Sequence, residues 1–168
     1  MAHSEARCLI LACGNTLRSD DGLGPWLAAR AQERFAREPR VRVIARQQWT
    51  PDLAEDVAAA ESVVFVDCSM ESAPGKVQLI PVTPAASTVT LGTHELSAAQ
   101  LLALGHELYG SLPADAILLT IGAASIELGE TFSNPVQAAL PEARSVLEST
   151  VARMLRAELP GASQRSKS

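Results

Sequence analysis

Three residues of this sequence combine side-chain types and positions that could hold a divalent metal ion. Asp21 follows the first apolar run of the chain, Asp67 ends a later one, and His94 closes a long loop. Carboxylate and imidazole groups suit first-row divalent metals, and three protein ligands leave coordination positions open for water or substrate. The two aspartates are 46 positions apart and His94 follows 27 positions later, so only the fold can bring the three together.

Each residue near these positions also has a simpler structural interpretation. Asp20 and Asp21 precede an expected helix, where carboxylates cap the first turn and favour the helix dipole. Asp67 could accept backbone hydrogen bonds in a turn, and a single loop histidine such as His94 is usually a surface residue. Cys68 could be a soft ligand or a nucleophile, although a small buried residue is the simpler interpretation.

Five short apolar runs predict the strands that must position these side chains. Most are apolar almost throughout, as expected for strands covered on both faces of a sheet. The fourth run contains Pro81, which cannot donate a ladder hydrogen bond, so we expect this strand at an edge of the sheet. The predicted strands are residues 8–12, 41–45, 62–66, 77–82 and 116–121.

Apolar residues at helical spacing and helix-start signals predict four helices among these strands. In the third we expect an inner stripe made of Leu101, Leu104 and Leu108, and in the fourth we expect Pro141 to break or kink the helix near its start. The four helices begin near Leu23, Thr50, Ser97 and Asn134.

The alternation of strands and helices predicts a three-layer α/β/α sandwich. Its centre is a mostly parallel, twisted five-stranded sheet with helices on both faces. In such folds ligands bind at the carboxyl ends of the strands, which is where Asp21 and Asp67 are expected.

Composition limits the classes of function. The 168 residues are 47% apolar, which predicts a single domain over residues 1–159 and a disordered tail over 160–168. The net charge of −5 argues against nucleic acid as a partner. An odd number of cysteines favours a reducing compartment, and no apolar run approaches the roughly 20 residues of a membrane span. We therefore expect a cytoplasmic monomer with no membrane partner.

Four segments resemble the nickel-iron hydrogenase maturation endopeptidases, the processing proteases of the hydrogenase large subunit. The resemblance covers nearly the whole domain, and the segments follow the order expected for the family. They are LILACGNTLRSDDGLG in the first strand and loop, VVFVDCS, THELS and ILLTIGAASIELGETFSNPVQAALPEA.

The resemblance implies an endopeptidase that removes a C-terminal extension from the large-subunit precursor after nickel insertion. Asp21, Asp67 and His94 would then contact nickel supplied by the substrate, with other divalent metals as substitutes, and Asp20 is a candidate general base. Asp21 falls where other members have glutamate. The residues implied to shape the loop are Gly14, Asn15, Gly22 and Gly24.

One segment departs from the family pattern. Where many relatives have a Gly-Gly-Thr-like turn after the second strand, this chain reads RQQWTP over residues 46–51. Gln48 and Thr50 of this segment are expected to border the cleft and to help select the large subunit, which points to a different hydrogenase subgroup.

Two other functions remain open at this point. One is a non-catalytic nickel-checkpoint chaperone that docks on the large subunit without cutting it. The other is a small nucleotide-binding enzyme that uses the loop over residues 14–24, although its glycines do not form the G-x-G-x-x-G pattern.

Overall fold

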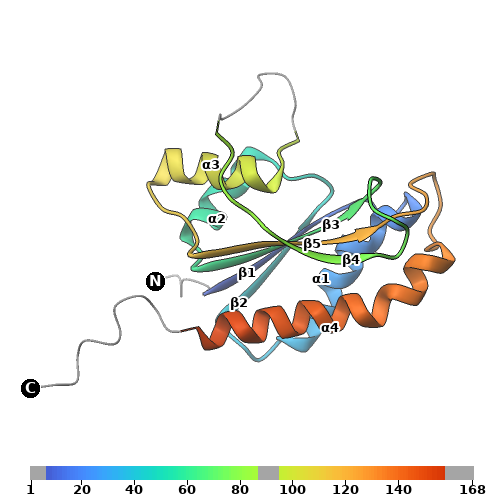
Figure 1. Ribbon diagram of the computed structural model, residues 1–168. Coiled ribbons are helices and arrows are strands. Elements are labelled where there is room, and N and C mark those ends of the chain that lie inside the picture. The colour runs from blue at the N-terminus through green and yellow to red at the C-terminus, as the bar shows by residue number, and fades with distance from the viewer. Residues whose placement is uncertain (1–6, 87–94, 158–168) are drawn as a thin grey trace, which may run out of the picture.

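A five-stranded sheet forms the centre of the computed structural model, which describes residues 7–86 and 95–157 (Figure 1). The strand order is β2-β1-β3-β5-β4, and all neighbours are parallel except β4, which pairs antiparallel with β5 at one edge. This confirms the predicted mostly parallel sheet and the edge position of the proline-containing strand. The strands are β1 (Cys8–Cys13), β2 (Val41–Arg46), β3 (Ser62–Ser69), β4 (Val77–Pro81) and β5 (Asp115–Gly122).

Helices cover both faces of the sheet, as predicted for a three-layer sandwich. Figure 1 shows α1 and α4 on one face and α2 and α3 on the other. Two short 3-10 turns, η1 and η2, lead into α1 and α2. The bounds are η1 (Ser19–Gly22), α1 (Leu23–Arg34), η2 (Pro51–Leu53), α2 (Ala54–Ala59), α3 (Ala98–Tyr109) and α4 (Asn134–Arg156).

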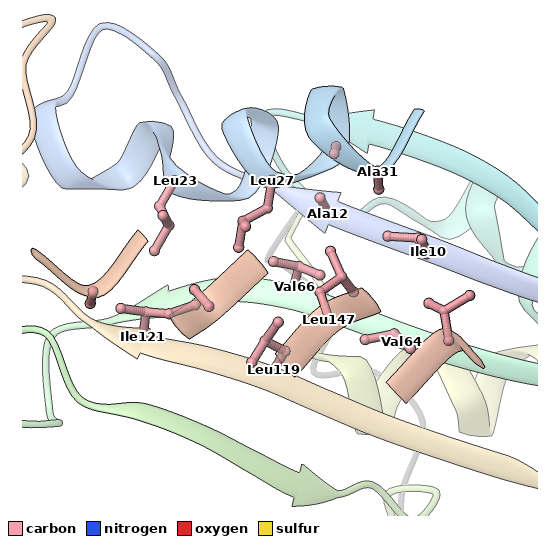
Figure 2. Close-up of a cluster of buried hydrophobic side chains, with 14 of the residues drawn as sticks. Ile10, Ala12, Leu23, Leu27, Ala31, Val64, Val66, Leu119, Ile121 and Leu147 are labelled. Carbon is pink, nitrogen blue, oxygen red and sulfur yellow. The ribbon is translucent and has the colours of Figure 1, made fainter. Parts of the chain in front are cut away.

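The hydrophobic core is divided in two by the sheet, because successive residues of a strand point to opposite faces. In β1, Ile10 and Ala12 face α1 and α4, whereas Leu9 and Leu11 face α2 and α3. Figure 2 shows the first cluster, in which Leu147 of α4 lies close to the strand residues. Both faces of the central strands are therefore buried, which explains their almost continuous apolar sequence.

The capping box that predicts the start of α3 is confirmed, but its predicted inner stripe is partly wrong. The Ser97 hydroxyl accepts from the Gln100 backbone N–H, and the Gln100 side chain accepts from the Ser97 N–H. Leu101 is fully buried, whereas Leu108 is 60% exposed. The last turn of α3 has no buried residue, so an apolar side chain at the predicted helical spacing, such as that of Leu108, has no neighbouring surface to pack against there.

A break at Pro141, one of the two effects predicted there, is wrong, because α4 continues through the proline to Arg156. Pro141 lies on the exposed side of the helix. It lacks the N–H that would donate to the carbonyl of residue 137, so the helix loses one internal hydrogen bond there. Buried residues on both sides of the proline, Ala139 and Ala143, keep the inner face of the helix on the sheet. This packing outweighs the local cost of the proline.

Two predictions concern residues outside those that the structure describes. The expected disordered tail over 160–168 is one, and His94 is the other. Within the described ranges, no helix has the length and apolar character needed to cross a membrane.

Candidate metal-binding site

The structure brings Asp21 and Asp67 together at the carboxyl edge of the sheet. Asp67 lies near the end of β3, and Asp21 lies in η1, which follows β1. The neighbouring residue Cys68 joins them, and one donor atom from each of the three lies within 4.8 Å of the others. The topology that was expected to unite the two aspartates therefore does so, and it adds a thiol.

Glu95 is the described residue nearest in sequence to His94, the third predicted ligand. Its side chain is exposed and lines the same pocket as Asp21 and Asp67. The described chain thus resumes at the rim of the site, at the residue that follows His94 in the sequence. Glu95 was not singled out from the sequence, because an exposed acid after a loop carries no distinguishing pattern.

The loop after β1 fixes the position of Asp21 through close backbone contacts. The Asn15 N–H donates to Oδ2 of Asp21 over 2.8 Å. Gly14 has a φ of +148°, and a Cβ at that position would lie 1.9 Å from the Asp21 carbonyl oxygen. A side chain at residue 14 would therefore displace Asp21, so the close approach of these two backbone segments requires glycine at residue 14.

The same loop is fastened to a segment more than a hundred residues away. The Ser19 N–H donates to the Gly129 carbonyl over 2.8 Å, and the Ser19 hydroxyl donates to the Glu127 carbonyl over 2.8 Å. Arg18 Nε donates to the Ile126 carbonyl over 3.1 Å. These bonds hold η1, and with it Asp21, over the ends of β1 and β3.

Asp20 has a different environment from the one expected of a general base. Its side chain is fully buried and accepts four hydrogen bonds, from the Ala124 and Ser125 N–H groups and from the N–H and hydroxyl of Ser133. Burial alone would raise the pKa of the Asp20 carboxyl, but the hydrogen bonds outweigh burial and leave the pKa below its usual value. A fully buried carboxylate that accepts four hydrogen bonds, three on Oδ2 and one on Oδ1, and whose pKa is lowered is a poor proton acceptor, so Asp20 is not part of the proposed catalytic set.

The environment of Asp67 disfavours the ionised form of its carboxyl group. Burial raises its pKa to about 6, and the negative charges of Asp21 and Glu95 act in the same direction. Hydrogen bonds from the Cys13 thiol and the Cys68 N–H oppose this rise, the latter over 2.8 Å. Crowded carboxylates of this kind are relieved by a bound cation, which makes the cluster a candidate cation site.

Two cavities that share lining residues open beside the aspartates. The smaller, of about 210 Å³, contains Asp21 and the loop after β1, and the larger, of about 680 Å³, has the buried ring of Trp49 in its wall. Asp67 lines both. The larger cavity is also lined by Leu96, Ala98 and Leu118, and the residues common to both are Gln48, Asp67 and Glu95.

The two residues singled out in segment 46–51, which departs from the family pattern, differ in their relation to these cavities. Gln48 lines both of them. Thr50 lines neither: it precedes η2, and its hydroxyl forms a hydrogen bond with Asp52. Gln48 is therefore the better placed of the two for contact with a bound substrate.

The donor set fits a first-row divalent cation. Carboxylate oxygens are ligands for such metals in general, and a thiol adds preference for the softer members of the series. Open space beside Asp67 would leave room for a further ligand from outside the protein. The arrangement can thus bind a metal and present it to a molecule in the larger cavity.

Comparison with known proteins assigns the fold to a functional class. A family model described as hydrogenase maturation protease matches residues 26–150, a range that contains Asp67 and begins after Asp21. Among curated proteins no significant match was found.

Several solved structures are similar to this chain over most of their length. The hydrogenase maturating endopeptidase HybD from E. coli is 21% identical, with a TM-score of 0.71 over 88% of this chain and 93% of that one. The NiFe hydrogenase maturation protease HybD from Thermococcus kodakarensis is 26% identical, with a TM-score of 0.64 over 86% and 98%. The maturation protease HycI from the same organism is 25% identical, with a TM-score of 0.63 over 92% and 95%. Because the family model matches most of this chain, residues 26–150, the chain belongs to the hydrogenase maturation protease family, whose members are peptidases.

Proposed function

We propose that this protein is an endopeptidase that removes the C-terminal extension of a nickel-iron hydrogenase large-subunit precursor after nickel insertion. The observation that carries the proposal is the meeting of Asp21 and Asp67 beside an open cavity, in a chain of this family. The nickel belongs to the substrate and serves as the recognition element. A precursor without nickel would lack the group that these carboxylates bind.

The carboxylates are held so that each keeps an oxygen for the metal. Oδ2 of Asp21 accepts from the Asn15 N–H, whereas Oδ1 accepts from the thiol of Cys68, a weak donor that a metal could replace. Oδ1 of Asp67 accepts from the Cys68 N–H, which leaves its other oxygen for a cation or for the Cys13 thiol. His94 is proposed as a further ligand on the basis of the family resemblance. Bound nickel would polarise the scissile carbonyl or lower the pKa of a coordinated water.

The larger cavity is the proposed seat of the scissile peptide. Its wall is mostly apolar, from Trp49, Leu96 and Leu118, and Asp67 lies at its junction with the metal pocket. Apolar side chains near the cleavage point would bury surface here, while the amide of Gln48 could hydrogen-bond the peptide backbone. Holding the peptide beside the metal would supply the orientation that peptide hydrolysis requires.

The test is cleavage of a purified precursor followed by intact-mass spectrometry. Nickel-loaded large-subunit precursor, incubated with this protein, is expected to lose its C-terminal extension, whereas nickel-free precursor should remain intact. A stable complex with the loaded precursor and no loss of mass would contradict the endopeptidase and favour the nickel-checkpoint chaperone. Cleavage of both precursors at the same rate would contradict recognition through nickel.

A further inference from the structure

The thiol of Cys68 lies inside the acidic cluster, and no part of the proposed function uses it. The thiol donates a hydrogen bond to Oδ1 of Asp21, with Sγ and Oδ1 3.4 Å apart. Both residues belong with Asp67 to the group whose ligand atoms lie within 4.8 Å of one another. Cys68 is only partly buried. It therefore differs from a cysteine that merely fills space in the core.

The separation of the sulfur and the oxygen matches that of two ligands on one metal ion. With a metal–sulfur bond of about 2.3 Å and a metal–oxygen bond of about 2.1 Å, such ligands stand about 3.1–3.6 Å apart at angles from 90° to tetrahedral. The observed distance falls inside this range. A cation could thus be held by Cys68 and Asp21 without movement of β3 or η1.

The direction of β3 explains why Cys68 reaches Asp21 from a different side than Asp67 does. Successive strand residues point to opposite faces of a sheet. Asp67 lines the cavities, whereas Cys68 follows the alternation of Val64 and Val66, which face α1 and α4. Asp21 lies over the end of the strand, near both side chains. A cation between the three residues would therefore be contacted by Asp67 from one side and by Cys68 from the other.

The other two cysteines of the sequence do not share this position. Cys8 is fully buried in the core, with its Sγ 3.8 Å from the sulfur of Met154. Cys13 is buried and hydrogen-bonds Asp67 but is outside the cluster of three donors. Cys8 is therefore a control thiol remote from the site, whereas Cys13 is the alternative ligand that the test must distinguish from Cys68.

We propose that Cys68 is a metal ligand of this site and biases it toward nickel and the other softer divalent metals over magnesium and calcium. A thiolate sulfur favours such metals, whereas carboxylates alone accept hard cations equally well. As the sulfur–metal bond forms, the sulfur donates an electron pair and the thiol proton passes to solvent. The inference deepens the proposed function, because it names a residue that selects the metal carried by the substrate.

Cobalt(II) and nickel(II) titrations of the protein itself test this role without any cleavage reaction. The wild type is expected to develop a thiolate-to-cobalt charge-transfer absorption, and Cys68→Ser should lose that band. Affinity for both metals should fall at least on the order of tenfold in Cys68→Ser, the cost already seen when groups that merely support a ligand are removed. Binding of magnesium should be unchanged. Cys8→Ala should keep the band, and circular dichroism checks that each variant is folded.

The outcomes separate this inference from the proposed function. If Cys68→Ser keeps the band and the affinity, or if Cys13→Ser loses the band instead, then Cys68 is not the ligand and the inference is overturned. If no cobalt binds to the wild type at all, the inference also fails. The proposed function is tested separately, by the cleavage assay. If the wild type binds cobalt through Cys68 but never shortens the nickel-loaded precursor, the metal site is supported and the peptidase activity is contradicted.

Discussion

Asp20 and Ser133, 113 residues apart in the chain, are joined by two hydrogen bonds of 2.8 Å. One comes from the Ser133 N–H and the other from its hydroxyl, and the N–H groups of Ala124 and Ser125 also donate to Asp20. The 3-10 turn that carries Asp21 is therefore tied to the segment between β5 and α4. The position of Asp21, a proposed metal ligand, therefore depends on the hydrogen bonds of its buried neighbour Asp20.

Replacing Asp20 by asparagine should destabilise the fold in a pH-dependent way. The substituted side chain would turn an amide N–H₂ toward groups that themselves donate, so we expect a loss of about 3 kcal/mol in the free energy of unfolding at pH 7. The pKa of Asp20 is lowered on folding. Its stabilising effect is thus present above the unfolded pKa of about 4 and is lost as the pH falls through the folded value.

Urea unfolding of the wild type and Asp20→Asn at pH 7 and at acid pH measures this effect. The difference between the two proteins should shrink below about pH 4. Glu107→Gln, a change of charge at an exposed position of α3, is the matched control and should have little effect. An Asp20→Asn penalty of the same size at every pH would contradict the assignment.

The metal-free site should be most stable when Asp67 is protonated. Folding raises the pKa of Asp67 to about 6, so the stability linked to its neutral form is complete below about pH 4 and is lost as the pH rises through 6. Asp67→Asn cannot ionise. With a chelator present, its stability relative to the wild type should rise by up to about 3 kcal/mol between pH 4 and pH 8. A constant difference across this range in denaturant titrations would rule the explanation out.

Gly24→Ala should destabilise the protein through a steric clash at the start of α1. A Cβ at Gly24 would lie 2.1 Å from the Cys13 carbonyl oxygen, which belongs to β1 and cannot give way cheaply. We expect a cost of about 3 kcal/mol in the free energy of unfolding. Gly110→Ala is the comparison, because Gly110 has a φ of +70° and a Cβ added there would have no atom within 4 Å. That variant should cost about 1 kcal/mol from backbone strain alone, and an equal or larger cost there would contradict the clash.

Gln48 is expected to contribute to binding of the precursor. It lines both cavities beside Asp67, so Gln48→Ala should lower kcat/KM for cleavage by roughly tenfold, the effect of one lost hydrogen bond to substrate. Gln137→Ala, at an exposed position of α4, removes the same amide away from the site and should leave cleavage unchanged. Equal activity of the two variants would exclude Gln48 from substrate binding.

The sequence was sufficient to predict the sheet and the meeting of Asp21 and Asp67, because both rest on chain-wide regularities. Strands buried on two faces are almost continuously apolar, and the residues after parallel strands gather at one edge of the sheet. Asp20 could not be assigned in this way, since its four donors come from residues 124–133 and only the tertiary structure brings them near. Leu108 and Pro141 were misjudged because local spacing and propensity do not reveal where a packing partner ends or how far a buried face extends.

The contact between Cys68 and Asp21 could not be predicted from the sequence either. Next to Asp67 in an apolar strand, Cys68 is typical of a small buried residue, and its contact with Asp21 depends on how the loop after β1 folds back over β3. The loop takes that course because Gly14 and Asn15 contact Asp21 closely. These contacts join positions that no local pattern connects.

Recognition of the substrate's nickel by Asp21 and Asp67 can be measured by incubating nickel-loaded precursor with Asp21→Asn and with Asp67→Asn. Intact-mass spectrometry follows cleavage, beside the wild type and Glu107→Gln. Each asparagine keeps the size of the side chain and removes the charge that would bind the metal. We expect the wild type and Glu107→Gln to shorten the precursor. Both asparagine variants, shown by circular dichroism to be folded, should leave it at full length. Normal shortening by either asparagine variant would contradict the claim that these two carboxylates recognise the substrate's nickel.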